Sequence, residues 1–98
     1  MSRPASFHRL AEIELFEAIT YYANVGNELA AAFVAEAQAA LGSILAFPES
    51  APLVGKTVRR KQLRRFPYAL LYAIRPAEIR VLAVANLKRR PFYWRGRK

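Results

Sequence analysis

The chain contains no cysteine and only one histidine, His8, among its 98 residues. Disulfide bonds and thiolate metal sites are therefore excluded. A structural zinc site is excluded with them, because it needs several Cys or His ligands. The four glycines stand apart at positions 26, 42, 55 and 96, so there is no glycine-rich loop to hold phosphate. We expect neither a metal nor a nucleotide cofactor.

Signals for export or membrane insertion are also lacking. The N-terminal MSRPASFHRL has no apolar segment of the secretory type. No stretch approaches the ~18 uninterrupted apolar residues of a membrane span. Apolar residues make up 54% of the chain, which is typical of a folded protein rather than a disordered one. We expect a single soluble domain over residues 1–98, located in the cytoplasm and without a membrane partner.

Acidic residues are almost missing from the second half. Residues 1–50 carry two basic and six acidic residues, a net charge of −4, whereas residues 51–98 carry fourteen basic residues and one acid, a net charge of +13. A basic face kept only for solubility needs far fewer like charges. This polarity therefore indicates an acidic partner for the second half, either a nucleic acid or a protein.

Apolar residues recur at helical spacing in two segments of the first half. The first, residues 7–22, has its stripe at Ala11, Leu15, Ala18, Ile19 and Tyr22, with Glu14 and Glu17 placed off it. The second runs to about Ala46, with its seam at Ala30, Phe33, Ala37, Ala40, Leu41 and Ile44. We expect Gly26 to end the first helix and Asn27 to cap the second. The pattern predicts an antiparallel helical hairpin.

After Pro52 the apolar period changes from 3.6 to about 2. Residues 57–65 are strongly charged and are interpreted as an exposed edge strand. Residues 68–75 and 79–86 are apolar on both faces and nearly adjacent, which predicts an antiparallel pair of buried strands. The short ASFHR segment before the first helix could add an edge strand. The fold class is α+β, an N-terminal helical hairpin packed on a small antiparallel β-sheet.

Groups suited to proton transfer are scarce in the basic half, where Glu78 and several tyrosines are the candidates. The acids of the first half lie at helix-surface spacing and are interpreted as a solvated face. What remains is arginine with aromatic residues, concentrated in TVRRKQLRR and in the final NLKRRPFYWRGRK. Tyr93 and Trp94 could stack on bases, or Trp94 could cover the end of the core.

An ordered set of motifs spans nearly the whole chain: AEIELFEAITYY (residues 11–22), RFPYALLY (65–72), VLAVA (81–85) and RRPFYWRGR (89–97). This set resembles the RelE/ParE superfamily of bacterial toxins. The similarity is closest to the ParE-like plasmid-stabilisation branch, whose members often have FPY in the middle strand and R-x-P-x-Y-W after the last one.

The resemblance implies two alternative activities. RelE-like members cleave mRNA on the ribosome with cationic side chains on the sheet and a tyrosine near the C-terminus. In this chain, two of the expected arginines fall on Ala69 and Leu87, and one expected lysine falls on Gln62. Asn86 replaces a frequent histidine and takes no proton at neutral pH. A ribonuclease would have to rely on Arg60, Lys61, Arg89 and Tyr93 instead.

The departures favour the other branch, in which the resemblance implies a type II toxin that inhibits DNA gyrase without chemistry of its own. Its partners would be gyrase, or the gyrase–DNA complex, and a small cognate antitoxin with an acidic tail, in a toxin–antitoxin hetero-oligomer. The expected target-binding residues are Arg60, Arg64, Arg65, Arg89, Arg90, Tyr93, Trp94 and Arg97. A non-toxic domain that binds nucleic acid is the remaining alternative.

Overall fold

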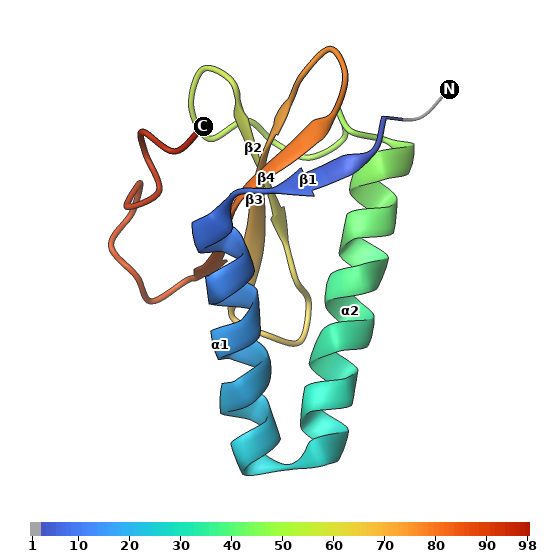
Figure 1. Ribbon diagram of the computed structural model, residues 1–98, viewed down its shortest axis with the longest axis vertical. Coiled ribbons are helices and arrows are strands. Elements are labelled where there is room, and N and C mark those ends of the chain that lie inside the picture. The colour runs from blue at the N-terminus through green and yellow to red at the C-terminus, as the bar shows by residue number, and fades with distance from the viewer. Residues whose placement is uncertain (1–2) are drawn as a thin grey trace.

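A computed structural model describes residues 3–98 and places a helical hairpin on one side of a four-stranded sheet (Figure 1). The elements in chain order are β1 (Ala5–Phe7), α1 (Arg9–Val25), α2 (Asn27–Ala46), β2 (Val58–Gln62), β3 (Tyr68–Ile74) and β4 (Ile79–Asn86). The expected α+β class, the hairpin and the N-terminal edge strand are confirmed.

The strand order in the sheet is β1-β4-β3-β2, with β1 and β2 at its edges. Strands β2, β3 and β4 pair in the antiparallel sense, whereas β1 pairs parallel with β4, so the sheet is mixed. β1 covers β4 only as far as the pair Phe7–Val81. The register between β3 and β4 then shifts, because Leu71 pairs with Ala83 and Tyr72 with Val81, which leaves Leu82 in a bulge.

A single residue joins the two helices. The N–H of Gly26 donates to the carbonyl of Tyr22, and the carbonyl of Gly26 accepts from the N–H groups of Leu29 and Ala30. Gly26 therefore ends α1 and is also the cap of α2. The prediction that Asn27 caps α2 is wrong, because the link is so short that Asn27 is already the first helical residue.

The two faces of the sheet bury different sets of residues. Leu70, Tyr72, Val81 and Val84 point toward the helices and pack with Phe33, the centre of the main core. Ala69, Leu71, Ala83 and Ala85 point to the opposite face, where they form a second cluster with Trp94. This alternation follows from the two-residue period of a strand. Small side chains on the second face leave room for another layer.

One helix in the described part of the chain, α2, is long and apolar enough to cross a membrane by length and composition, with a mean hydropathy of 1.6. The apolar composition of α2 is also explained by packing, since four of its residues are buried against the rest of the fold. They are Ala30, Phe33, Ala40 and Ile44.

Candidate binding surface formed by the C-terminal tail

Residues 87–98, here called the tail, leave β4 through a turn at Asn86. The Asn86 carbonyl accepts from the N–H of Arg89 and its side-chain Oδ1 accepts from the N–H of Lys88, each at 2.9 Å. The tail then lies on the sheet face opposite the helices (Figure 1). Trp94 is 9% exposed and packs on the alanine-rich second cluster. Trp94 thus covers the second cluster, and only a small part of its side chain stays accessible.

Glu14 of α1 holds the end of the tail. Its Oε1 and Oε2 accept from Nη1 and Nη2 of Arg97 at 2.9 and 3.0 Å. Oε1 also accepts from the N–H of Val84 at 3.0 Å, and Oε2 accepts from the hydroxyl of Tyr93 at 2.8 Å. The side chains of Glu14 and Arg97 are only 10% and 12% exposed. One carboxylate therefore ties α1, β4 and the tail together.

Glu14 and Arg97 both differ from what the sequence predicted. Glu14 is not part of a solvated face, because its side chain is only 10% exposed and its carboxylate accepts hydrogen bonds from β4 and the tail. It lies three residues after Ala11 and four before Ala18, both of which are buried. That spacing was the signal that it shares their face of α1. Arg97 was expected to face a partner, but its guanidinium is used internally by Glu14 and by the carbonyl of Leu82 at 3.0 Å.

Tyr93 is half-buried between the Glu14 carboxylate and the guanidinium of Arg89, which lies 4.1 Å from the centre of its ring. Burial raises the pKa of Tyr93 far above its usual value, and the hydrogen bond to Glu14 raises it further, because both favour the neutral hydroxyl. At neutral pH this hydroxyl is a donor committed to Glu14. It is not placed to act as a base.

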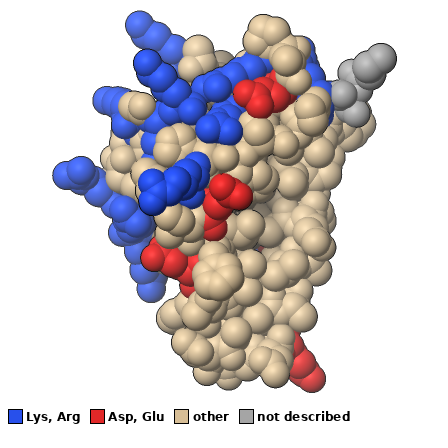
Figure 2. Space-filling model, viewed as in Figure 1, with Lys and Arg blue, Asp and Glu red and all other residues tan. Residues whose placement is uncertain are grey.

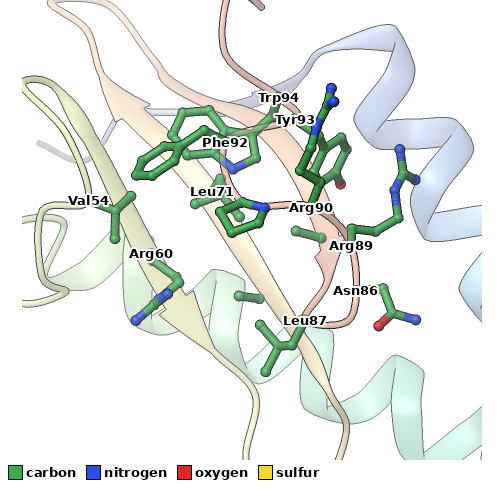
Figure 3. A pocket seen from close by; sticks show the side chains of 13 residues that line it. Val54, Arg60, Leu71, Asn86, Leu87, Arg89, Arg90, Phe92, Tyr93 and Trp94 are labelled. Atoms are coloured by element: carbon green, nitrogen blue, oxygen red, sulfur yellow. The ribbon is translucent and has the colours of Figure 1, made fainter.

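A groove of about 330 Å³, the tail groove, opens between the tail and strands β2 to β4 (Figure 3). Its floor is apolar and includes Ala69 and Leu71. Arg60 lies on the β2 side, while Arg89 and Arg90 come from the tail on the other side. These three arginines are exposed, and no acidic side chain is found among the described residues that line the groove. The arrangement suits an anionic ligand.

Three of the four residues that a ribonuclease would need, Arg60, Arg89 and Tyr93, line the tail groove, but the fourth, Lys61, does not. Arg60 pairs with Leu71 and lies on the groove face, whereas Lys61 pairs with Leu70 and lies on the face covered by the helices. Neighbouring residues of a strand point to opposite faces, so both cannot reach one phosphate. Two positions where RelE-like members are expected to have arginine are Ala69 and Leu87 in this chain. Both line the groove as apolar side chains.

Arg64 and Arg65 lie outside the lining of the tail groove, in the loop between β2 and β3. Their side chains are exposed, but both backbone N–H groups donate to Oε1 of Glu36 on α2, at 2.9 Å for Arg65. Glu36 therefore fixes the loop, and these two arginines present a second basic site near the end of the sheet. Figure 2 shows basic side chains gathered over the top and left of the viewed face, with acidic side chains beside and below them, and a largely uncharged surface on the right.

Phe92 was absent from the sequence-based set, yet it is the exposed aromatic of the tail. It is 43% exposed and has φ 61°, the only positive value at a non-glycine residue in the described part of the chain. Within RRPFYWRGR the neighbouring Tyr93 and Trp94 drew attention instead. Nothing in the local sequence indicates which of three consecutive aromatics will face outward, since that depends on the unusual backbone.

Comparisons with known proteins agree on one assignment. A family model described as the ParE toxin of the type II toxin-antitoxin system, parDE, matches residues 5–91. Among solved structures, "Chromosomal ParDE TA system from P. aeruginosa" superposes with a TM-score of 0.76 at 19% identity, covering 88% of this chain and 97% of the other. No curated protein sequence matches the chain.

Proposed function

Because this chain belongs to the ParE toxin family of type II toxin-antitoxin systems, we propose that it arrests growth by inhibiting DNA gyrase in the cytoplasm, with residues 1–98 acting as one toxin domain. Gyrase is the target that the family resemblance implies. In this proposal the protein binds its target through the tail face and carries out no reaction of its own.

The observation that carries the proposal is that some side chains of the tail are bonded internally, whereas others remain exposed. Tyr93 and Arg97, the groups that could serve acid–base or phosphate chemistry, are both held by Glu14. Arg60, Arg89 and Arg90 remain exposed around a groove that offers no base. Cleavage of RNA needs positioned proton donors and acceptors, whereas binding needs only exposed complementary groups. The geometry therefore supports a docking surface over a nuclease site.

A toxin of this family is expected to be neutralised by a cognate antitoxin. We propose a small protein with an acidic tail, since the second half of the chain carries a net charge of +13. A partly disordered acidic segment that folds on binding would cover the arginines that act on the cell. Toxin and antitoxin would then form a hetero-oligomer. Co-expression with the adjacent reading frame should restore growth.

Charge reversal tests the proposed surface directly. The double variant Arg89→Glu/Arg90→Glu should abolish growth arrest on controlled expression. Wild-type protein should induce DNA-damage signalling and alter plasmid topology while leaving mRNA intact. The matched control is Arg9→Glu/Arg75→Glu, which changes the net charge equally at two residues outside the groove. Its toxicity should equal that of the wild type.

Thermal unfolding of each variant is needed beside these measurements, because Arg89 stacks on Tyr93. Full toxicity of a folded Arg89→Glu/Arg90→Glu protein would exclude the tail groove as the target surface. Cleaved mRNA without a DNA-damage response would instead assign the protein to the ribonuclease branch.

A further inference from the structure

Two grooves meet at Phe92. The tail groove lies on one side, and a second groove of about 410 Å³ lies on the other, between the tail and the loop before β2. They share Val54, Phe92 and Trp94 as lining residues. Lys56 and Arg95 add positive charge to the second groove, and within residues 3–98 no acidic side chain lines either groove. We call these two adjoining grooves, which share lining residues and both carry basic side chains, the basic track.

Phe92 stands where the two grooves join and is held there at a cost. A φ of 61° lies in the left-handed region, which a bulky side chain rarely adopts. Such conformations persist where the surrounding structure imposes them, and they cluster at functional sites. The ring contacts Trp94 with centroids 5.6 Å apart, and the Arg95 guanidinium lies 4.6 Å from its centre. Even so, Phe92 remains 43% exposed.

An exposed aromatic ring between cationic grooves is the arrangement that binds unpaired nucleic acid. Arginines neutralise successive phosphates, and an aromatic face stacks on a base of any sequence. We propose that a single-stranded segment of DNA lies along the two grooves, with one unpaired base stacked on Phe92 and phosphates paired with Arg60, Arg89 and Arg90. The choice of DNA over RNA rests on the proposed inhibition of gyrase.

Phe92 distinguishes single-stranded DNA from an acidic polypeptide as the ligand. Carboxylates would satisfy the arginines but give the exposed ring no stacking partner. Duplex DNA would also meet the arginines, but its bases are already paired and stacked. The track therefore predicts a preference for a single strand, and Phe92 should carry that preference.

The first test measures binding of a labelled oligothymidylate by fluorescence anisotropy, with the protein alone. Phe92→Gly removes the ring, and glycine adopts the φ of 61° at this position without steric cost. Phe92→Tyr keeps an aromatic face. We expect Phe92→Gly to bind about tenfold more weakly and Phe92→Tyr to bind as the wild type does. Three phosphate contacts predict a slope of about −2 in log K against log salt concentration. Trp94, the single tryptophan, should be quenched on binding.

Thermal unfolding establishes that both variants are folded. The proposal is overturned if folded Phe92→Gly binds as tightly as the wild type, or if a duplex of equal charge binds as tightly as the single strand. It is also overturned if oligouridylate RNA binds tenfold more tightly than the DNA strand. Competition by polyglutamate at equal charge, with no dependence on Phe92, would assign the grooves to an acidic polypeptide.

A second test separates this inference from the proposed function, using purified gyrase and supercoiled plasmid. Wild-type protein should stabilise cleaved DNA, and Phe92→Gly should stabilise much less of it. Equal cleavage by the wild type and Phe92→Gly would leave gyrase inhibition standing and overturn the DNA contact. No cleavage by the wild type, together with Phe92-dependent binding of the oligonucleotide, would contradict the gyrase proposal and support the single-strand site.

Discussion

Glu14 and Arg97 form a bidentate ion pair although they are 83 positions apart in the chain. The pair lies beside β4, beyond the point where the short strand β1 stops covering its edge. There, Glu14 accepts from the N–H of Val84 and Arg97 donates to the carbonyl of Leu82. The pair thus satisfies backbone groups that no strand reaches, and it fixes the tail that forms one wall of the groove.

Removing one partner of this pair should destabilise the protein strongly. Arg97→Met leaves the Glu14 carboxylate nearly buried without its cation, which costs about 3 kcal/mol of unfolding free energy. Adding Glu14→Gln should recover at least about 1 kcal/mol of that loss, because the amide oxygen still accepts hydrogen bonds without an unpaired charge. Urea unfolding of wild type, single and double variants measures both effects.

The control for this cycle is Arg90→Met, an exposed residue of the same tail. It should change the unfolding free energy by less than about 0.5 kcal/mol. If Arg97→Met changes stability no more than Arg90→Met does, the ion pair contributes nothing and the tail is held by its other contacts, those of Tyr93 and Trp94.

The loop between β2 and β3 should depend on Glu36 in the same way. Its carboxylate accepts from the N–H groups of Arg64 and Arg65, and a hydrogen bond to a charged group contributes about 1.5–3 kcal/mol. Glu36→Ala should therefore speed hydrogen exchange at these two amides, as followed by NMR. Glu17→Ala, at an exposed position of α1, is the control and should leave both amides unchanged.

Much of the fold could be predicted from the sequence because burial repeats with the period of each element. The stripe of Ala11 and Ala18 and the apolar run at residues 68–75 are local patterns, and they produced α1 and β3 with nearly correct bounds. The edge position of β2 followed from its charge. The parallel pairing of β1, the bulge at Leu82 and the one-residue link at Gly26 were not expected, since none of them leaves a periodic signal.

The candidate site was harder to predict because its contacts are between distant residues. Glu14 was interpreted as a surface acid because its partners, Val84, Tyr93 and Arg97, lie at least 70 residues away. The outward ring of Phe92 depends on one backbone angle that no spacing encodes. Composition correctly located the positive charge in the second half. It did not indicate which arginines are used internally.

The two faces of β2 give a prediction that separates binding from RNA cleavage. Arg60 lines the tail groove, whereas Lys61 lies on the helix-covered face. Arg60→Glu should therefore raise at least tenfold the expression level that is required for growth arrest. Lys61→Gln should leave that level unchanged. Titrating the inducer against colony counts measures both. Equal loss of toxicity in the two variants would indicate that both side chains serve one catalytic site.

Tyr93 should give the protein a distinctive response to alkali. The free side chain has a pKa near 10, and the folded value is raised by burial and by the hydrogen bond to Glu14. Below pH ~10 the neutral hydroxyl stabilises the fold fully. Above it the unfolded chain loses the proton first, so the unfolding free energy falls as the pH rises toward the folded pKa.

Tyr93→Phe removes this dependence and should cost about 1 kcal/mol at pH 7, where only the hydrogen bond is lost. Difference absorbance between the wild type and Tyr93→Phe isolates this group from Tyr22 and Tyr72, whose pKa values burial also raises. Because the hydroxyl is committed to Glu14, a folded Tyr93→Phe protein should still arrest growth. Complete loss of toxicity without loss of folding would mean that the hydroxyl takes part in the reaction, as a ribonuclease requires.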